Sequence, residues 1–400
     1  MIVKKFYTTY YYGPTEQYVV KPETVANIAA AGFDLMPLHY STAVNKQALP
    51  ILKRYGIRAM VGDPRIGRVY NSDDFAAADS VVKAVAEDYA EFDNIEGWDI
   101  IDEPNSEKFP ILAAIVNAIK KHTPDKEPLI NLFPNYASPE QLGNPDYLTH
   151  LEEYVNVVRP TILSYDHYHF LGREQRNAIL DDGRIDEREK LIRISAESTE
   201  NRGGFFENIE TVMKVCKKYG IPPMLIVLLV EHGPYRNLTE AEILWEVNMC
   251  LVYGMKRISY FTYWCPPDDP FWHYRNAICD EQGNKMQHYY DVSKINREIA
   301  AVGEHLFGTD PAEVFHIGAS EAGTQVFEGF GPIDSIEGND GVIGFFDNGS
   351  IYLCNRDFRN SNTFKLNSKM PLTVFKDGVF EELGSDSVTL EAGAAVLLRA

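Results

Sequence analysis

The sequence predicts a (β/α)₈ barrel followed by a small all-β domain, and three observations support this fold class. Eight short apolar runs rich in β-forming residues alternate with longer helical patterns, and eight such units in roughly 300 residues fit a (β/α)₈ barrel. The first run ends in Tyr-Tyr-Tyr-Gly-Pro, without the glycine-rich phosphate turn that a doubly wound open sheet, the structural alternative, usually carries. After residue 308 the pattern changes to short strands separated by hairpin turns.

The strands and helices of the barrel can be placed from composition and periodicity. The predicted strands begin near Lys5, Phe33, Arg58, Ile95, Pro128, Thr161, Pro223 and Arg257. The predicted helices are Pro22–Ala31, Ala43–Tyr55, Asp74–Phe92, Phe109–His122, Pro145–Val158, Phe206–Tyr219, Thr239–Tyr253 and Met286–Leu306. Several helices end at a glycine, which is favoured just past a helix C-terminus, and Thr239 with Glu242 fits a capping box.

One connection is much longer than the others. Residues 171–204 follow the sixth predicted strand and are charged and poorly periodic. Loops that follow barrel strands gather on the catalytic face and usually span about 2–6 residues. The segment is either a solvated insertion or a lid, and we expect it to pack over the barrel mouth and to restrict the site to a pocket or short cleft.

The C-terminal part predicts a second domain. Asn348-Gly349 and Asp377-Gly378 each separate two apolar runs, and such dipeptides are typical of type I′ hairpins. The predicted domains are therefore a barrel over residues 1–308 and a small β-sandwich over residues 309–400.

Composition restricts the class of protein and its partners. The hydrophobic share of 45% and the charged share of 24% are ordinary for a globular protein. No apolar run is long enough to span a membrane, and five cysteines without a CxxC motif indicate neither a disulfide framework nor a zinc knuckle. The net charge of −20 repels polyanions such as nucleic acid. The N-terminus does not read as a signal peptide, so we expect a cytoplasmic protein or a mature form whose signal has been removed. A homo-oligomer is left open.

Two adjacent acids end the fourth predicted strand. Asp102 and Glu103 follow the run Ile-Glu-Gly-Trp-Asp-Ile-Ile and precede Pro104, which stops the strand. In a barrel, the carboxyl ends of the strands are where catalytic residues lie. A carboxyl group that is partly desolvated and next to another carboxylate has a raised pKa, which makes it a usable proton donor near neutrality. The alternative is an acid pair that only caps the following helix.

A third acid ends the seventh predicted strand. Residues 224–230, Met-Leu-Ile-Val-Leu-Leu-Val, are entirely apolar and predict a buried parallel strand that ends at Glu231. Glycoside cleavage requires a proton donor and a second carboxylate. Glu231 can supply the second group, unless it is simply a surface residue of the following loop.

This arrangement resembles the retaining (β/α)₈ glycoside hydrolases of clan A. In that clan an acid/base glutamate follows strand four, commonly as Asn-Glu-Pro, and a nucleophilic glutamate ends strand seven. Asp102-Glu103-Pro104 and Glu231 match those positions. The resemblance covers the barrel, and a C-terminal β-domain is a common companion. It implies that Glu103 protonates the leaving oxygen and Glu231 attacks the anomeric carbon. The clan's asparagine, which usually contacts the sugar 2-hydroxyl, is replaced here by Asp102, which leaves that contact and the glycone open.

Other predicted strand ends supply candidate substrate-binding groups. For each, a role in hydrogen bonding or packing at the mouth is about as well supported as substrate contact, except for Trp264, which matches a sugar-platform tryptophan of many clan members. These candidates are Asp102, His39, Tyr40, Asp63, Arg65, Asn135, Tyr165, Asp166, His167, Tyr168 and Trp264.

Two other functions remain as alternatives. A metal-dependent barrel hydrolase would use His167, His169, Asp63 and His39 as ligands. A non-catalytic carbohydrate-binding barrel would be expected to lack one of the two glutamates, yet both are present. The sequence therefore predicts a glycosidase that acts on oligo- or polysaccharides by a retaining two-glutamate mechanism and needs neither cofactor nor metal.

Overall fold

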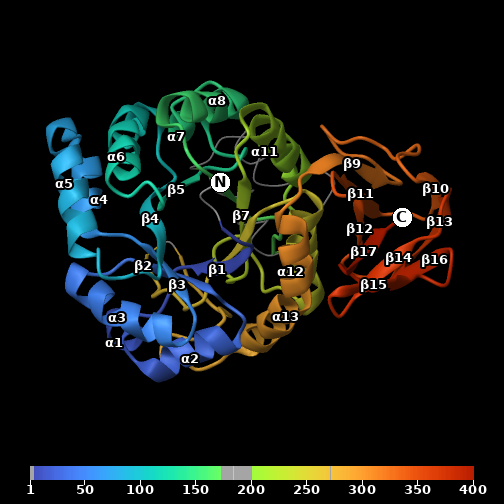
Figure 1. The fold of residues 1–400 in the computed structure, drawn as a ribbon, viewed down its shortest axis with the longest axis horizontal. Helices are drawn as coiled ribbons and strands as arrows, with labels where there is room; N and C mark the ends of the chain where they lie inside the picture. Colours follow the sequence, from blue (N-terminus) through green and yellow to red (C-terminus); the bar gives the residue numbers. More distant parts are fainter. Residues whose placement is uncertain (1–3, 173–182, 184–200, 271) are drawn as a thin grey trace.

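A computed structural model describes residues 4–172, 183, 201–270 and 272–400. Its first part is a nearly closed barrel of eight parallel strands surrounded by helices (Figure 1), as the sequence predicts. The strands pair in the order β1-β8-β7-β6-β5-β4-β3-β2. They are β1 (Tyr7–Tyr11), β2 (Leu35–Leu38), β3 (Arg58–Val61), β4 (Ile95–Asp102), β5 (Glu127–Leu132), β6 (Leu163–His167), β7 (Pro223–Leu228) and β8 (Arg257–Phe261).

The predicted helices are present, with ends that differ by a few residues. The larger barrel helices are α2 (Pro22–Ala30), α3 (Thr42–Arg54), α5 (Phe75–Asp88), α6 (Phe109–His122), α8 (Tyr147–Val158), α11 (Phe205–Tyr219), α12 (Glu240–Val252) and α13 (Gln287–Phe307). The capping box of Thr239 and Glu242 at the start of α12 is confirmed. The shorter helices α1 (Glu16–Val19), α4 (Pro64–Ser72), η1 (Ser106–Lys108) and α7 (Pro139–Leu142) were not predicted.

The barrel closes between β1 and β2 through the residues that precede β2. The Asp34 N–H donates to the Thr8 carbonyl (3.3 Å), and the Thr8 hydroxyl donates to the Gly32 carbonyl (2.7 Å). These bonds satisfy backbone groups that the strand ladder leaves unpaired at this seam.

A buried ion pair crosses the interior at the amino-terminal ends of β5 and β8. The Arg257 guanidinium donates to both carboxylate oxygens of Glu127, at 2.7 and 3.0 Å, and both side chains have no solvent exposure. Gly97 of β4 approaches the same place so closely that a Cβ atom would lie 2.2 Å from the Glu127 carbonyl oxygen. A bidentate arginine–carboxylate pair lets each charge neutralise the other in this buried layer.

We expect Glu127→Gln to lower the free energy of unfolding by about 3–5 kcal/mol, because it leaves the Arg257 charge buried without a counter-charge. Urea denaturation measures this difference. The exposed pair of Glu337 and Lys365 provides the matched control: Glu337→Gln should cost less than about 1 kcal/mol. Equal costs for the two variants would contradict the role given to the buried pair.

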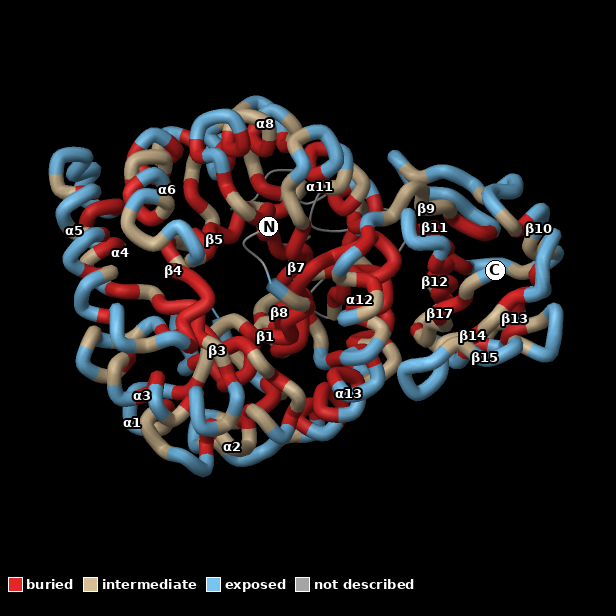
Figure 2. The backbone as a smooth tube through the Cα atoms, viewed as in Figure 1, coloured by how far each residue is buried: buried red, intermediate tan, exposed pale blue. Residues whose placement is uncertain are grey.

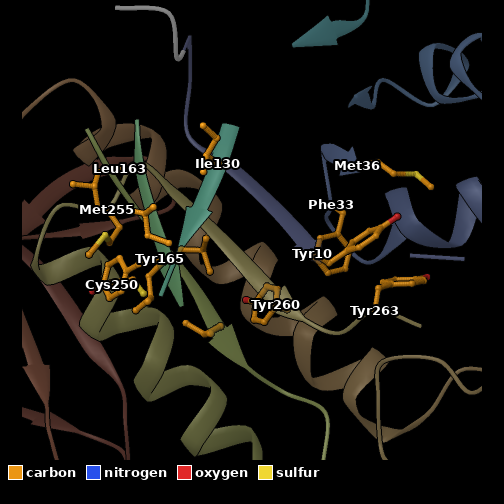
Figure 3. Close-up of a cluster of buried hydrophobic side chains, with 14 of the residues drawn as sticks. Tyr10, Phe33, Met36, Ile130, Leu163, Tyr165, Cys250, Met255, Tyr260 and Tyr263 are labelled. Atoms are coloured by element: carbon orange, nitrogen blue, oxygen red, sulfur yellow. The ribbon is translucent and has the colours of Figure 1, made fainter. Parts of the chain in front are cut away.

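Most of the core lies between the strands and the surrounding helices, and Figure 2 shows the strands mainly buried and the outer helix faces exposed. The outward-facing side chains of the strands pack there against the helices. In Figure 3, Tyr10, Phe33 and Tyr263 lie together in one part of this layer. Tyr165 of β6 lies in another part with Cys250 of α12.

The C-terminal part consists of two antiparallel sheets. One contains β15 (Val379–Glu382), β14 (Thr373–Lys376), β17 (Ala395–Arg399), β12 (Ser350–Asn355), β11 (Gly341–Phe346) and β9 (Pro311–Ile317). The other contains β10 (Ile333–Glu337), β13 (Asn362–Ser368) and β16 (Ser387–Leu390). Side chains of both sheets, such as Leu353 and Phe364, share one apolar cluster, which makes the arrangement a sandwich.

The two predicted hairpin turns differ. Asp377 and Gly378 both have positive φ (47° and 86°), as a type I′ turn requires. In the other turn only Gly349 has positive φ (81°), and Asn348 does not. The prediction of a type I′ turn there is therefore wrong, because a three-residue connection between Phe346 and Ser350 needs only one left-handed residue.

The sandwich packs on α12 of the barrel. The Trp245 indole donates to the Arg356 carbonyl (2.9 Å), and the Asn248 amide donates to the Gly393 carbonyl (2.8 Å). The helix α13 ends at Phe307 and β9 begins at Pro311. The division into domains at 308/309 stays a prediction.

The long connection after β6 falls mostly on residues 173–182 and 184–200, which lie outside the described part of the chain. Its described ends meet: Phe170 forms an antiparallel bridge with Asn201, and Leu171 forms one with Tyr235. The lid stays a prediction. Among the described helices, none has the length and apolar character that a membrane crossing requires.

Candidate active site

Glu103 stands at the carboxyl end of β4 in an unusual backbone conformation. A register shift between Asp99 and Ile101 interrupts the pairing of β4 with β5, and Glu103 then takes a left-handed φ of 46°. Its N–H donates to the Asn131 carbonyl at 2.9 Å. A left-handed conformation in a residue other than glycine costs on the order of 1–3 kcal/mol and is concentrated at functional sites. The strand therefore turns sharply at its last acids.

Four side chains around Glu103 form what we call the mouth cluster: Asp102, Glu103, Asn131 and Asp166. The Asn131 amide nitrogen donates to Oδ1 of Asp102 and to Oδ1 of Asp166, at 3.0 Å each. The Ser164 hydroxyl donates to the Asn131 amide oxygen (2.8 Å), which fixes the orientation of that amide. Glu103 lies within hydrogen-bonding reach of Asp166. Strands β4, β5 and β6 thus bring three carboxyl groups together.

The electrostatics of the cluster favour the protonated acid forms. Burial and the negative charge of Asp102 raise the pKa of Glu103 to about 7, against an opposing hydrogen bond with Asp166. Burial, followed by the charges of Glu103 and Asp102, raises the pKa of Asp166 well above its usual range. Desolvation also raises the pKa of Asp102, although water still reaches part of its side chain. The cluster therefore holds protons at pH values where isolated carboxyl groups are ionised.

A histidine–aspartate pair borders the cluster on the side of β2. His39 Nε2 lies 2.9 Å from an oxygen of Asp99, and the ring is partly exposed. Although desolvation lowers the pKa of His39, the negative charges of Asp99 and Asp102 outweigh it and raise the pKa above the usual range. Tyr11 of β1 lies between these acids and the aromatic residues of β8.

Aromatic rings line the mouth on the side of β6 to β8. Tyr168 stacks on Phe261 at 5.5 Å with an interplanar angle of 17°. His232 contacts both rings and stacks on Tyr274 at 5.3 Å. Burial lowers the pKa of His232 to about 4, so this ring is neutral near pH 7, and its Nδ1 donates to the Val230 carbonyl (2.9 Å).

Glu231 follows β7 and is fixed by the connection after β8. It forms an antiparallel bridge with Arg275, with hydrogen bonds of 2.9 and 3.0 Å in the two directions. The Asn276 amide donates to the Glu231 carboxylate at 2.7 Å. The side chain is half-buried. Its carboxylate is therefore held by residues of the connection that follows β8.

Four predicted site residues make structural contacts outside the mouth cluster. Asp63 caps α4, pairs with Arg65 and also accepts from Thr42 and Tyr89. The Tyr40 hydroxyl donates to the Pro14 carbonyl. The Asn135 amide donates to the Gly204 carbonyl (3.0 Å), at the start of α11.

Three further predicted residues are buried away from the cluster. Side chains alternate along a strand, so Asp166 faces the barrel interior while Tyr165 and His167 face the helices. His167 packs between Tyr136 and Phe205. Trp264 is 2% exposed and packs against Tyr18. The aromatic residue of β8 that contacts Tyr168 is Phe261.

The structure thus brings together Asp102, Glu103, Asp166, Tyr168 and His39 among the predicted residues. Within the described residues, no three His, Cys, Asp or Glu side chains are arranged to hold a metal ion. His167 and His169 are buried among aromatic rings and separate from Asp63. The ligand set of the metal-hydrolase alternative is therefore not assembled.

Sequence reasoning missed several mouth residues. Asn131, Asp99, Phe261 and Asn276 were not predicted. A signal for Asn131 was available: it is the one polar side chain in the run Pro-Leu-Ile-Asn-Leu-Phe, and a polar group inside a buried strand requires partners. Asn276 lies in an irregular connection, where no periodicity could indicate it.

Comparison with known proteins supports the assignment of the fold. No protein-family model matches the chain, and no curated protein sequence does. The structure of a β-galactosidase from Bacillus circulans sp. alkalophilus matches over 100% of both chains, with a TM-score of 0.65 and 10% identity. A glycoside hydrolase family 5 protein from Bacteroides vulgatus ATCC 8482 matches over 98% of this chain and 89% of its own, with a TM-score of 0.58 and 11% identity. The chain therefore shares with these two structures the fold of a barrel followed by a β-domain.

Other matches cover only part of longer proteins. A cold-adapted β-galactosidase from Rahnella sp. R3 has a TM-score of 0.53 and 11% identity, over 77% of this chain. This chain spans 58% of that protein, and it also spans less than two thirds of other β-galactosidase chains. At these identities the likeness concerns the fold, so activity has to be argued from the site.

Proposed function

We propose that the protein is a glycoside hydrolase that cleaves O-glycosidic bonds of oligo- or polysaccharides by a retaining mechanism. The observation that carries the proposal is Glu103, a carboxyl group at the mouth of a clan A-like barrel with a pKa raised to about 7. Such an acid is half protonated at neutral pH and can donate its proton and then take one back. The names of the proteins that share the fold, β-galactosidase and glycoside hydrolase family 5, support the same class.

Glu103 is the acid/base of the proposed reaction. In the first step its proton goes to the glycosidic oxygen as the bond to the anomeric carbon breaks. In the second step the Glu103 carboxylate removes a proton from the incoming water, so the group returns to its starting state. Asp102 is partly solvent-exposed beside Glu103 and, with His39 and Tyr168, is positioned to bind the glycone.

Glu231 is the nucleophile of the proposed reaction. It follows β7, and its carboxylate is oriented by the Asn276 amide. A retaining pair requires roughly 5–5.5 Å between the two carboxyl groups, because the anomeric carbon lies between them. Asp166 lies within hydrogen-bonding reach of Glu103, which is closer than the spacing of a retaining pair, so Asp166 is not proposed as the nucleophile.

The activity should fall with rising pH, with a midpoint near pH 7. The pKa of Glu103 is raised to about 7, and the first step needs its protonated form, which is lost as the pH rises through that value. The measurement is the pH dependence of kcat/KM for an aryl glycoside with a poor leaving group. A decrease of kcat/KM with a midpoint near pH 5, the range of an unperturbed carboxyl, would contradict the assignment of Glu103 as the acid.

The proposal is tested by a screen of aryl glycosides that varies sugar and anomeric configuration, with the products analysed by chromatography. We expect hydrolysis of at least one sugar class without added metal. Binding of oligosaccharides without turnover of any glycoside would favour the non-catalytic carbohydrate-binding alternative instead.

A further inference from the structure

Asp166 is the most enclosed carboxyl group of the mouth cluster. It is 5% exposed, whereas Asp102 is exposed and Glu103 is intermediate. No arginine, lysine or histidine of the described chain forms an ion pair with it. Its neighbours on the open side are the carboxyl groups of Glu103 and Asp102. Ionising a buried carboxyl without a counter-charge is costly, so the neutral acid is the favoured form.

The Asn131 amide determines which oxygen of Asp166 is available. Its nitrogen donates to Asp166 Oδ1 at 3.0 Å. The Ser164 hydroxyl donates to the amide oxygen of Asn131, so a flip of this amide would break that hydrogen bond. Asp166 Oδ1 is thus an acceptor, and Oδ2 is left to carry the proton. Glu103 is the group within hydrogen-bonding reach.

We propose that Asp166 is a positioning residue that acts as a neutral carboxylic acid, whose Oδ2–H donates to the carboxylate of Glu103. This inference rests on the proposed function, since it deepens the role of Glu103. When Glu103 gives its proton to the leaving oxygen, the negative charge that appears on Glu103 is stabilised by this donor. Asp166 keeps its own proton throughout. A neutral acid kept protonated by an enclosed site can serve as a hydrogen-bond donor in this way.

Several other titratable groups face the cluster from neighbouring elements. They are Tyr11 of β1, His39 of β2, Asp99 of β4, Tyr136 after β5, Tyr147 of α8 and Tyr168 after β6. Of these, His39 is the cationic group, and it pairs with Asp99. Among the described residues, therefore, no cation forms an ion pair with Asp166.

The direct test is ¹³C NMR of the protein labelled at aspartate and glutamate side-chain carboxyls. The Asp166 and Glu103 signals are assigned by their loss in Asp166→Asn and Glu103→Gln. We expect the Asp166 signal to stay at the position of a protonated carboxyl from pH 5 to pH 7. An Asp166 signal that is already ionised at pH 5 would overturn the proposal. This readout does not depend on turnover, so it remains decisive even if no glycoside is cleaved.

The variant Asp166→Asn gives a second test through Glu103. Because Asn131 donates to Oδ1, the new amide would turn its nitrogen toward Glu103 and replace one neutral donor by another. We expect the midpoint of the Glu103 carboxyl titration, measured by NMR in Asp166→Asn, to stay within about half a pH unit of the wild-type value. Asp166→Leu removes the donor and should raise that midpoint. If Asp166 were ionised, Asp166→Asn would remove a negative charge and lower the Glu103 midpoint by about one unit or more, which would overturn the proposal.

Asp63 provides the matched control. It is also a buried aspartate, 3% exposed, but it forms an ion pair with Arg65. Although burial raises the pKa of Asp63, hydrogen bonds from Arg65 and Thr42 and the charge of Arg65 outweigh this effect and lower the pKa. Asp63→Asn should lower Tm at pH 7, because it removes a stabilised charge. Asp166→Asn should raise Tm at pH 7, because it removes the cost of keeping a carboxyl protonated above its unfolded pKa. This gain should vanish as the pH falls to about 4. A lower Tm at pH 7 for Asp166→Asn than for the wild type would contradict the proposal that Asp166 is protonated.

Discussion

Glu231→Gln should abolish turnover of every substrate, with a loss in kcat of about 10⁴-fold or more. The amide is nearly isosteric with the carboxylate and can still interact with Asn276, so the fold and the binding of substrate should persist. It is not nucleophilic, however, and Asp166 lies within hydrogen-bonding reach of Glu103, which is too close to that acid for a retaining nucleophile. Steady-state rates with both activated and unactivated aryl glycosides measure the loss.

The matched control for this variant is Glu240→Gln. Glu240 lies in the first turn of α12, where it pairs with Lys294 on the surface. We expect this control to retain wild-type kcat and KM. Turnover by Glu231→Gln above about 1% of wild type would remove Glu231 from the proposed role of nucleophile.

The effect of Glu103→Gln on kcat should depend on the leaving group of the substrate. For glycosides with poor leaving groups, kcat should fall by about 10²–10⁴-fold, the usual contribution of a general acid. For dinitrophenyl glycosides the leaving group needs no proton, so formation of the glycosyl-enzyme should proceed at close to the wild-type rate. The falling pH limb near 7 should disappear for these activated substrates, because the group with the raised pKa has been removed.

Glu107→Gln is the matched control for Glu103→Gln. Glu107 is exposed in η1, four residues further along the chain. It should show the wild-type rate and the wild-type pH profile. Equal losses for activated and unactivated substrates in Glu103→Gln would indicate that Glu103 does not act as a proton donor.

The barrel could be predicted because its signals are local and repeated. The helix that begins at Thr239 carries its own capping box, and the run from Met224 to Leu228 is apolar because both faces of that strand are covered. The position of Glu103 at the end of β4 could be predicted for a similar reason. Its strand is eight residues long, and Pro104 shows where the strand stops.

The rest of the site depends on which way each side chain points. The sequence placed Tyr165, Asp166, His167 and Tyr168 together, but alternation along the strand directs only Asp166 and Tyr168 to the barrel interior. Asp63 was chosen because it ends a strand. The Asp63-Pro64 dipeptide also begins a helix, and capping α4 is the role that the structure shows.

The proposed retaining mechanism passes through a covalent intermediate on Glu231, and trapping that intermediate is the decisive experiment. The protein would be incubated with a panel of dinitrophenyl 2-deoxy-2-fluoro-glycosides of different sugars, and the labelled peptide would be sequenced by mass spectrometry. We expect one sugar residue to be added per protein, attached to Glu231, and no label on Glu231→Gln. Label on Asp166 or another residue, or cleavage of natural glycosides with inversion and no adduct from any member of the panel, would contradict it.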